Sequence, residues 1–127
     1  MRYTRIIKQM GDDFLLKMLT PIGLLIISNV FMTFAWYGHL NHKSTSLWVV
    51  IFLSWGLAFF EYIFQVPANR LGNEFFSAGQ LKVIQEVISL TVFSIFSVLY
   101  LKENFTMNHL YAFLCILGAV FFMFKKW

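Results

Sequence analysis

The chain has 127 residues, of which 59% are hydrophobic and only 13% charged, and its net charge at pH 7 is +4. Soluble domains are typically about 45–50% apolar and about 25% charged, and one of this size leaves roughly a third of its unfolded surface exposed. The composition therefore excludes a soluble enzyme, and also a disordered chain, which needs low hydrophobicity. The basic residues are spread along the chain without a nucleic-acid-binding motif, so we expect lipid headgroups, not nucleic acid, as their partners.

The first two apolar stretches are bounded by prolines. Residues 21–37 contain no charge, and Thr20 and Pro21 before and at their start are typical of an N-cap followed by the first helical position. The second stretch, residues 47–66, is interrupted by one carboxylate and is followed by Pro67, which we expect to end it. We therefore predict helices over 21–37 and 47–66.

The third and fourth stretches begin at capping residues. Ser77 and Gln80 have the spacing of a capping box, which predicts a helix over residues 80–101 with a start as early as residue 78. Thr106 is suited to cap a helix over residues 107–124. Each of the four stretches is about 17–22 residues long, enough to cross about 30 Å of hydrocarbon.

These stretches predict an all-α membrane protein, a four-helix transmembrane bundle formed by residues 18–127. The connections are short, so neighbouring helices should be antiparallel. Residues 1–17 include basic residues but no apolar core long enough for a signal peptide. We interpret them as a cytoplasmic N-terminal extension, which is non-native or dispensable if Met18 is the natural start.

The distribution of Lys and Arg predicts the orientation. Four crossings place both termini and the second connection on one side, which then holds eight basic residues against two on the other: Arg2, Arg5, Lys8, Lys17, Arg70, Lys82, Lys125 and Lys126 against Lys43 and Lys102. Cytoplasmic loops carry the excess of basic residues, so we expect both termini in the cytoplasm and the chain in the inner membrane. Without residues 1–17 the bias falls to four against two, which permits insertion in both orientations.

Polar residues within the apolar stretches are the candidates for function, because each is costly in a membrane unless it has a partner or a role. Three helix faces carry the candidates for binding a solute or a proton: Glu61, Gln65, Glu86, Asn29 and Trp36. A carboxylate in a low-dielectric environment holds a proton more readily, so it can exchange that proton for a cation. The alternative is packing, in which Lys82 and Glu86 form an ion pair and Glu61 bonds to Gln65. Glu61 leaves both possibilities open, and for Glu86 we favour the ion pair.

The sequence indicates a dimer, because four helices cannot enclose a cavity much larger than their own side chains, whereas eight can. The fourth stretch carries small residues that permit close helix–helix approach: Ala112, Cys115, Gly118 and Ala119. We expect no metal and no cofactor, since the three histidines lie near predicted helix ends and Cys115 is the single cysteine. The signatures of hydrolases and intramembrane proteases are absent, so we do not expect an enzyme.

Several motifs resemble one family. The stretch from Glu103-Asn104-Phe105-Thr106 through Gly118 is similar to the end of a drug/metabolite transporter repeat. The segments 29–39, 60–70 and 80–86 resemble a branch of small, uncharacterised four-helix proteins in that superfamily. The resemblance covers residues 18–126, and in this family proteins start near the position of Met18.

The resemblance implies an inner-membrane protein related to the small multidrug resistance transporters, which work as antiparallel dimers. Those transporters carry an essential glutamate in the first helix, where this chain has no acid and Asn29 is the nearest polar residue by position. Their exchange mechanism therefore cannot be transferred directly. We predict a secondary transporter of a small solute that acts as a homodimer by alternating access, with a non-transporting membrane subunit or scaffold for a larger partner as the alternative.

Overall fold

The computed structural model describes residues 1–126 and leaves Trp127 outside the described part of the chain. Its elements are helices, with no strand among the described residues: α1 (Arg2–Tyr37), the short 3-10 helix η1 (Gly38–Asn41), α2 (Leu47–Gly72), α3 (Ala78–Leu99) and α4 (Met107–Phe124). Each of α1 to α4 is long and apolar enough to cross a membrane. The prediction of four transmembrane helices is confirmed.

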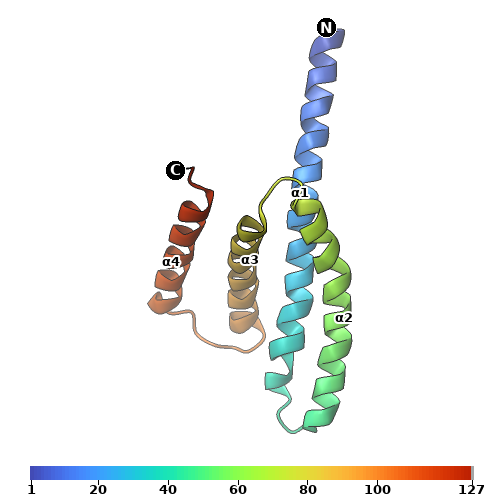
Figure 1. Cartoon of the computed structure of the whole chain (residues 1–127). Coiled ribbons are helices and arrows are strands. Elements are labelled where there is room, and N and C mark those ends of the chain that lie inside the picture. Colours follow the sequence, from blue (N-terminus) through green and yellow to red (C-terminus); the bar gives the residue numbers. More distant parts are fainter. Residues whose placement is uncertain (127) are drawn as a thin grey trace.

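The four helices stand side by side in an open row. Helix α1 packs against α2 on one side and α3 on the other, and α4 packs against α3 at the end of the row (Figure 1). Both chain termini lie on the same side of the row, the upper side in Figure 1, together with the end of α2 and the start of α3. A row of this kind leaves two broad faces uncovered, so the grooves between neighbouring helices open to the outside.

Helix α1 begins at Arg2, and the predicted start at Pro21 is wrong. The Thr20 hydroxyl does not cap a helix; its Oγ1 donates to the carbonyl of Leu16 at 2.7 Å, one turn back. Pro21 removes only one N–H donor from the hydrogen bonds of the helix. The residues on both sides of it are helical, and α1 continues through it. At 1.5 Å per residue the helix is roughly 54 Å long, so its first half extends beyond the other helices (Figure 1).

Helix α2 runs to Gly72, so the predicted end before Pro67 is also wrong. The turns beyond Pro67 are stabilised by packing: Ala68 is fully buried, and Gly72 lies tightly against two other helices. A Cβ added at Gly72 would lie 2.7 Å from Leu81 Cδ2 and 3.3 Å from Pro21 Cβ. Tertiary contact therefore overrides the local tendency of proline to end the helix.

The two capping predictions identify real helix starts. Ser77 Oγ accepts the N–H of Gln80 at 3.1 Å and Gln80 Oε1 accepts the N–H of Ser77 at 3.0 Å, so α3 begins at Ala78. It ends at Leu99, two residues earlier than predicted. Helix α4 has the predicted bounds, and the N–H of Thr106 donates to Nδ1 of His109 at 3.1 Å.

Candidate solute-binding grooves

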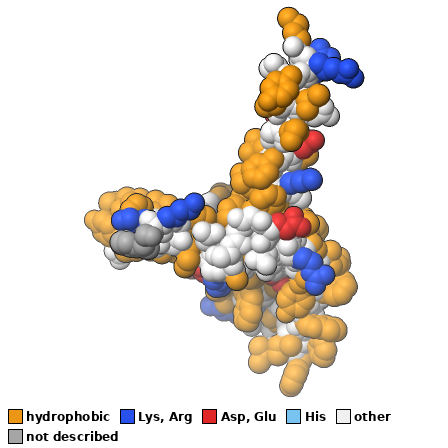
Figure 2. All heavy atoms as spheres, turned by 45° about the horizontal axis from the view of Figure 1, so that its top comes forward, with side chains coloured by type: hydrophobic (Ala, Val, Ile, Leu, Met, Phe, Trp, Pro, Cys, Tyr) orange, Lys and Arg blue, Asp and Glu red, His pale blue; other side chains and the backbone are white. Residues whose placement is uncertain are grey.

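The side chains are distributed in the opposite way to those of a soluble protein. Large apolar side chains cover the outside of the helices (Figure 2), including Trp48, Trp55 and Phe122. The buried set contains seven polar residues: Ser28, Asn29, Thr33, Glu61, Gln65, Ser94 and Ser97. Basic and acidic side chains lie along the projecting part of α1 (Figure 2). The polar residues that are costly in lipid are therefore placed between helices, where other polar groups can pair with them.

A chain of polar contacts links the first three helices. Ser28 on α1 lies 2.7 Å from Oε1 of Gln65 and 3.3 Å from Oε1 of Glu61, both on α2. Gln65 Nε2 then donates to Oε1 of Gln85 on α3 at 3.1 Å. Ser28 is fully buried, and Glu61 is only 7% exposed. Hydrogen bonds among one carboxyl, one hydroxyl and two amide groups thus join α1, α2 and α3 at one level.

The Ser28 hydroxyl couples Glu61 to Gln65, because a hydroxyl group has one hydrogen and can donate to one acceptor at a time. When Glu61 is protonated, it can donate to Ser28 while Ser28 donates to Gln65. When Glu61 is charged, it competes with Gln65 for the Ser28 hydrogen. The charge on Glu61 therefore affects how Gln65 is held.

Glu61 opens on a groove between α1 and α2. The groove has a volume of about 390 Å³, and Ser54 and Ala58 of α2 and Trp36 of α1 line it together with Glu61. Glu61 forms no ion pair with any basic residue among residues 1–126. A buried carboxyl without a cationic partner, at the edge of an open groove, is suited to pair with a cation from outside the chain.

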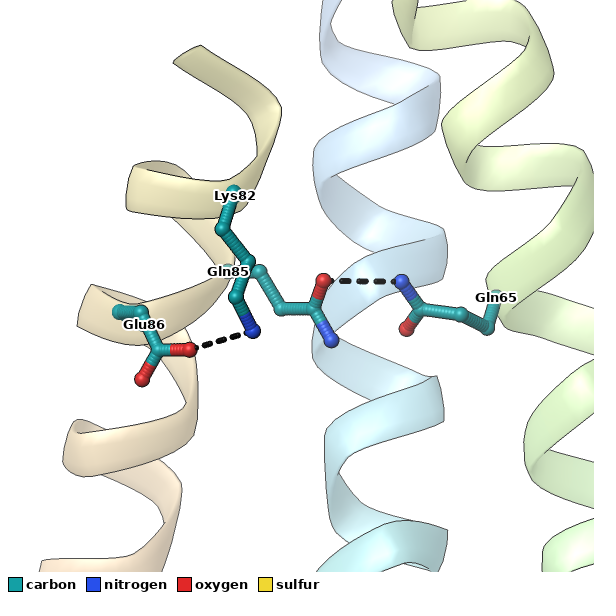
Figure 3. Close-up of polar contacts among 4 residues, drawn as sticks. All are labelled: Gln65, Lys82, Gln85 and Glu86. Atoms are coloured by element: carbon teal, nitrogen blue, oxygen red, sulfur yellow. Dashed lines mark hydrogen bonds and ion pairs between the residues drawn. The ribbon is translucent and has the colours of Figure 1, made fainter. Parts of the chain in front are cut away.

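Glu86 opens on a second groove, between α1, α3 and α4. This groove has a volume of about 490 Å³, and Thr33 and Trp36 of α1 and Ser89 of α3 line it with Glu86. Unlike Glu61, Glu86 has a basic partner: Lys82 Nζ lies 2.7 Å from its Oε1, four residues away on α3 (Figure 3). Both side chains are more than half exposed, so this is an open ion pair of the kind that we favoured for Glu86.

Trp36 lines the grooves of both Glu61 and Glu86. The structure therefore brings three of the five candidates to neighbouring grooves. Gln65 lines neither groove and acts through its bonds to Ser28 and Gln85.

Asn29 also lines neither groove. It is fully buried, and its Nδ2 donates to the carbonyl of Leu25 at 2.7 Å, one turn back on the same helix. Its Oδ1 has no partner among the described residues. Asn29, the first-helix residue to which the resemblance drew attention, therefore forms a hydrogen bond within its own helix in this structure.

Two residues of the polar chain, Ser28 and Gln85, were not among the sequence candidates. Ser28 is the residue before Asn29 and faces α2, where it meets Gln65. A serine and two glutamines within apolar stretches were the only signal, and helical spacing alone does not show which partners they meet on other helices.

The small residues of α4 remain uncovered. Ala112, Cys115 and Ala119 are exposed and Gly118 is half-buried, and α4 has no buried residue among those described. Each predicted interface residue is therefore accessible to another molecule from the end of the row.

One comparison with known proteins identifies the family. The family model DMT_6, described as "Putative member of DMT superfamily (DUF486)", matches residues 21–124. The chain belongs to this family. Membership of the DMT superfamily suggests a transporter, and with four candidate spans it makes the chain a multi-pass membrane protein. No curated protein and no solved structure matches the chain.

Proposed function

We propose that this DMT_6 member is a secondary transporter of a small organic cation that acts as a homodimer by alternating access. The observation that carries the proposal is Glu61: a buried carboxyl without a basic partner among residues 1–126, at the edge of a groove that an indole also lines. A cation over the face of Trp36 and beside Glu61 would gain both charge pairing and a cation–π contact.

The polar chain supports an exchange of protons for cations. A proton on Glu61 is compatible with the chain of donors from Glu61 through Ser28 to Gln65. A bound cation would replace that proton and would leave the Ser28 hydrogen free to serve Gln65. Proton and cation would therefore compete for the same oxygen atoms, which is the basic requirement for coupled exchange.

The open row supports the homodimer. The grooves of Glu61 and Glu86 open laterally, and in a membrane a single chain would expose them to lipid. A second copy would close them, and the exposed stripe of Ala112, Cys115 and Ala119 permits close approach of helices. The same reasoning holds for parallel and antiparallel pairs.

The test of the transporter is Glu61→Gln in proteoliposomes, with a panel of aromatic and quaternary-ammonium cations and an imposed pH gradient. We expect the substitution to abolish proton-coupled flux and to leave the protein folded, because glutamine keeps the size and one acceptor oxygen of the side chain. Glu74→Gln is the matched control, since Glu74 is exposed in the connection between α2 and α3. Unchanged coupled flux in Glu61→Gln would remove Glu61 from the mechanism.

The test of the homodimer is the mass of the protein in nanodiscs. Ala119→Leu adds bulk to the exposed stripe of α4 and should reduce the dimer fraction, whereas Leu117→Phe adds bulk on another face of the same helix and should not. A monomer at all lipid ratios would contradict the homodimer.

The uncovered row also fits a non-transporting membrane subunit that docks on a larger partner. The observation in its favour is α4, which has no buried residue among those described and therefore leaves a whole helix for a partner. This alternative predicts a stoichiometric copurifying membrane protein and no thermal stabilisation by any cation of the panel. Stabilisation by a cation that Glu61→Gln removes would exclude it.

A further inference from the structure

A third groove lies between the last turns of α2 and the first turns of α3. These turns are on the side of the row where both termini lie, the upper side in Figure 1. Its volume is about 580 Å³, larger than either groove beside Trp36. The polar side chains that line it are Asn69, Arg70, Asn73, Lys82 and Gln85. No acidic residue lines this groove.

The charges around this groove favour an anion. Arg70 forms no ion pair among residues 1–126, so its guanidinium is available to a ligand. Lys82 pairs with Glu86 at 2.7 Å (Figure 3), so the local charge with Glu86 included is still positive. The positive end of α3 at Ala78 and the negative end of α2 at Asn73 both line the groove and offset one another, so the side-chain charges decide its sign.

The amide side chains can complete the recognition of an oxyanion. Asn69 and Asn73 lie on successive turns at the end of α2, next to Arg70. The Oε1 of Gln85 already accepts from Gln65 at 3.1 Å (Figure 3), which leaves the Gln85 amide hydrogens to donate elsewhere. An arginine fork with neighbouring amides is the combination that binds phosphate groups.

The position of the groove indicates the source of the phosphate. The groove begins at Val66, the last residue of the apolar stretch 47–66, and the polar residues Asn69 and Arg70 follow on α2, so we take this level as the boundary between hydrocarbon and headgroups. Val66 is 56% exposed, and Leu81 forms the apolar floor beside it. Val66 and Leu81 thus add apolar surface to a groove whose other large side chains are polar, as a ligand with a charged headgroup and an acyl chain requires.

We propose that this groove is a binding site for the phosphate group of an anionic phospholipid. The guanidinium of Arg70 and the ammonium of Lys82 hold the phosphate, the amides of α2 contact its remaining oxygens, and an acyl chain lies along Val66. A soluble phosphate ester shares the headgroup chemistry but not the apolar contact. The site adjoins the groove of Glu86 through the Lys82–Glu86 ion pair, but neither carboxyl lines it, so lipid binding can be measured without transport.

Native mass spectrometry of the full chain in a neutral detergent tests the site, with phosphatidylglycerol as the anionic probe and phosphatidylcholine as the zwitterionic one. We expect at least one phosphatidylglycerol to be retained in preference to phosphatidylcholine. Arg70→Gln should weaken phosphatidylglycerol binding about fivefold, and Arg70→Gln with Lys82→Gln more strongly. Lys43→Gln is the matched control, because Lys43 lies in the connection between η1 and α2, on the side of the row opposite the termini.

Glycerol 3-phosphate in millimolar excess distinguishes the two sources. If it does not displace phosphatidylglycerol, the lipid assignment is supported. If it displaces the lipid from the wild-type chain at comparable concentration, the apolar contact contributes nothing and the lipid assignment is wrong. Equal phosphatidylglycerol binding by the wild-type chain and by Arg70→Gln with Lys82→Gln would overturn the site itself. Glu86→Gln frees Lys82 and should strengthen binding, a result that damage to the fold would not produce.

Discussion

Gln65 on α2 reaches Gln85 on α3, with 3.1 Å between the Nε2 of the first and the Oε1 of the second. The two side chains meet across α1 (Figure 3), and α2 and α3 otherwise have little contact with each other. This bond therefore joins α2 and α3, the two helices on either side of α1, directly to one another.

The pair can be measured by a double-mutant cycle with Gln65→Leu, Gln85→Leu and the double variant. We expect a coupling free energy of about 0.6 kcal/mol, the average for hydrogen bonds between transmembrane helices. Unfolding in mixed micelles with increasing dodecyl sulfate gives the free energies. Strict additivity of the two single substitutions would show that the bond contributes nothing to stability.

Gly72→Ala should destabilise the fold by about 1–3 kcal/mol, because the new methyl group would lie 2.7 Å from Leu81 Cδ2 and force the end of α2 away from α3. Gly56→Ala, on the same helix, is the control. A Cβ at Gly56 meets nothing within 4 Å, so this substitution should be neutral or stabilising by up to about 1 kcal/mol. Thermal unfolding of both variants in detergent compares them directly, and equal unfolding temperatures would contradict the close packing of Gly72.

A chain that starts at Met18 should keep the fold. Among the removed residues, Phe14 packs edge-to-face on Phe75, with the ring centroids 5.4 Å apart. Its loss should lower the free energy of unfolding by about 1 kcal/mol. Circular dichroism and chromatography of the shortened chain check this prediction, and aggregation or loss of helicity beyond the removed residues would contradict it.

The orientation can be tested with single cysteines in a Cys115→Ser background. Thr4→Cys and Ser44→Cys leave every charge in place. Thr4 lies at the start of α1 and Ser44 in the connection between η1 and α2, on opposite sides of the row. With both termini in the cytoplasm, an impermeant maleimide added to intact spheroplasts should label Ser44→Cys and should reach Thr4→Cys only after lysis.

Equal labelling of both cysteines in intact spheroplasts would mean that the chain inserts in both orientations. The bias of four basic residues against two, which remains without residues 1–17, makes the same experiment on the shortened chain informative.

Local signals predicted what is local. Ser77 and Gln80 marked the start of α3, because their side chains bond to backbone groups within one turn. Thr106 marked the start of α4, where its backbone N–H donates to the side chain of His109. Pro21 and Pro67 led to a wrong helix start and a wrong helix end, because packing of a long helix against its neighbours outweighs the loss of one N–H donor. The ion pair of Lys82 and Glu86 was accessible from spacing alone. The bond of Ser28 to Gln65 was not, because it joins residues 37 positions apart on different helices.

Trp36 has a consequence for any motion of α1. A single indole forms part of the wall of two grooves, one on each side of its helix. A rotation of α1 about its own axis that carries the ring toward Glu61 must carry it away from Glu86, so one groove narrows as the other widens. The volumes of the two grooves are thereby coupled through one ring. A ligand that widens either groove would narrow the other.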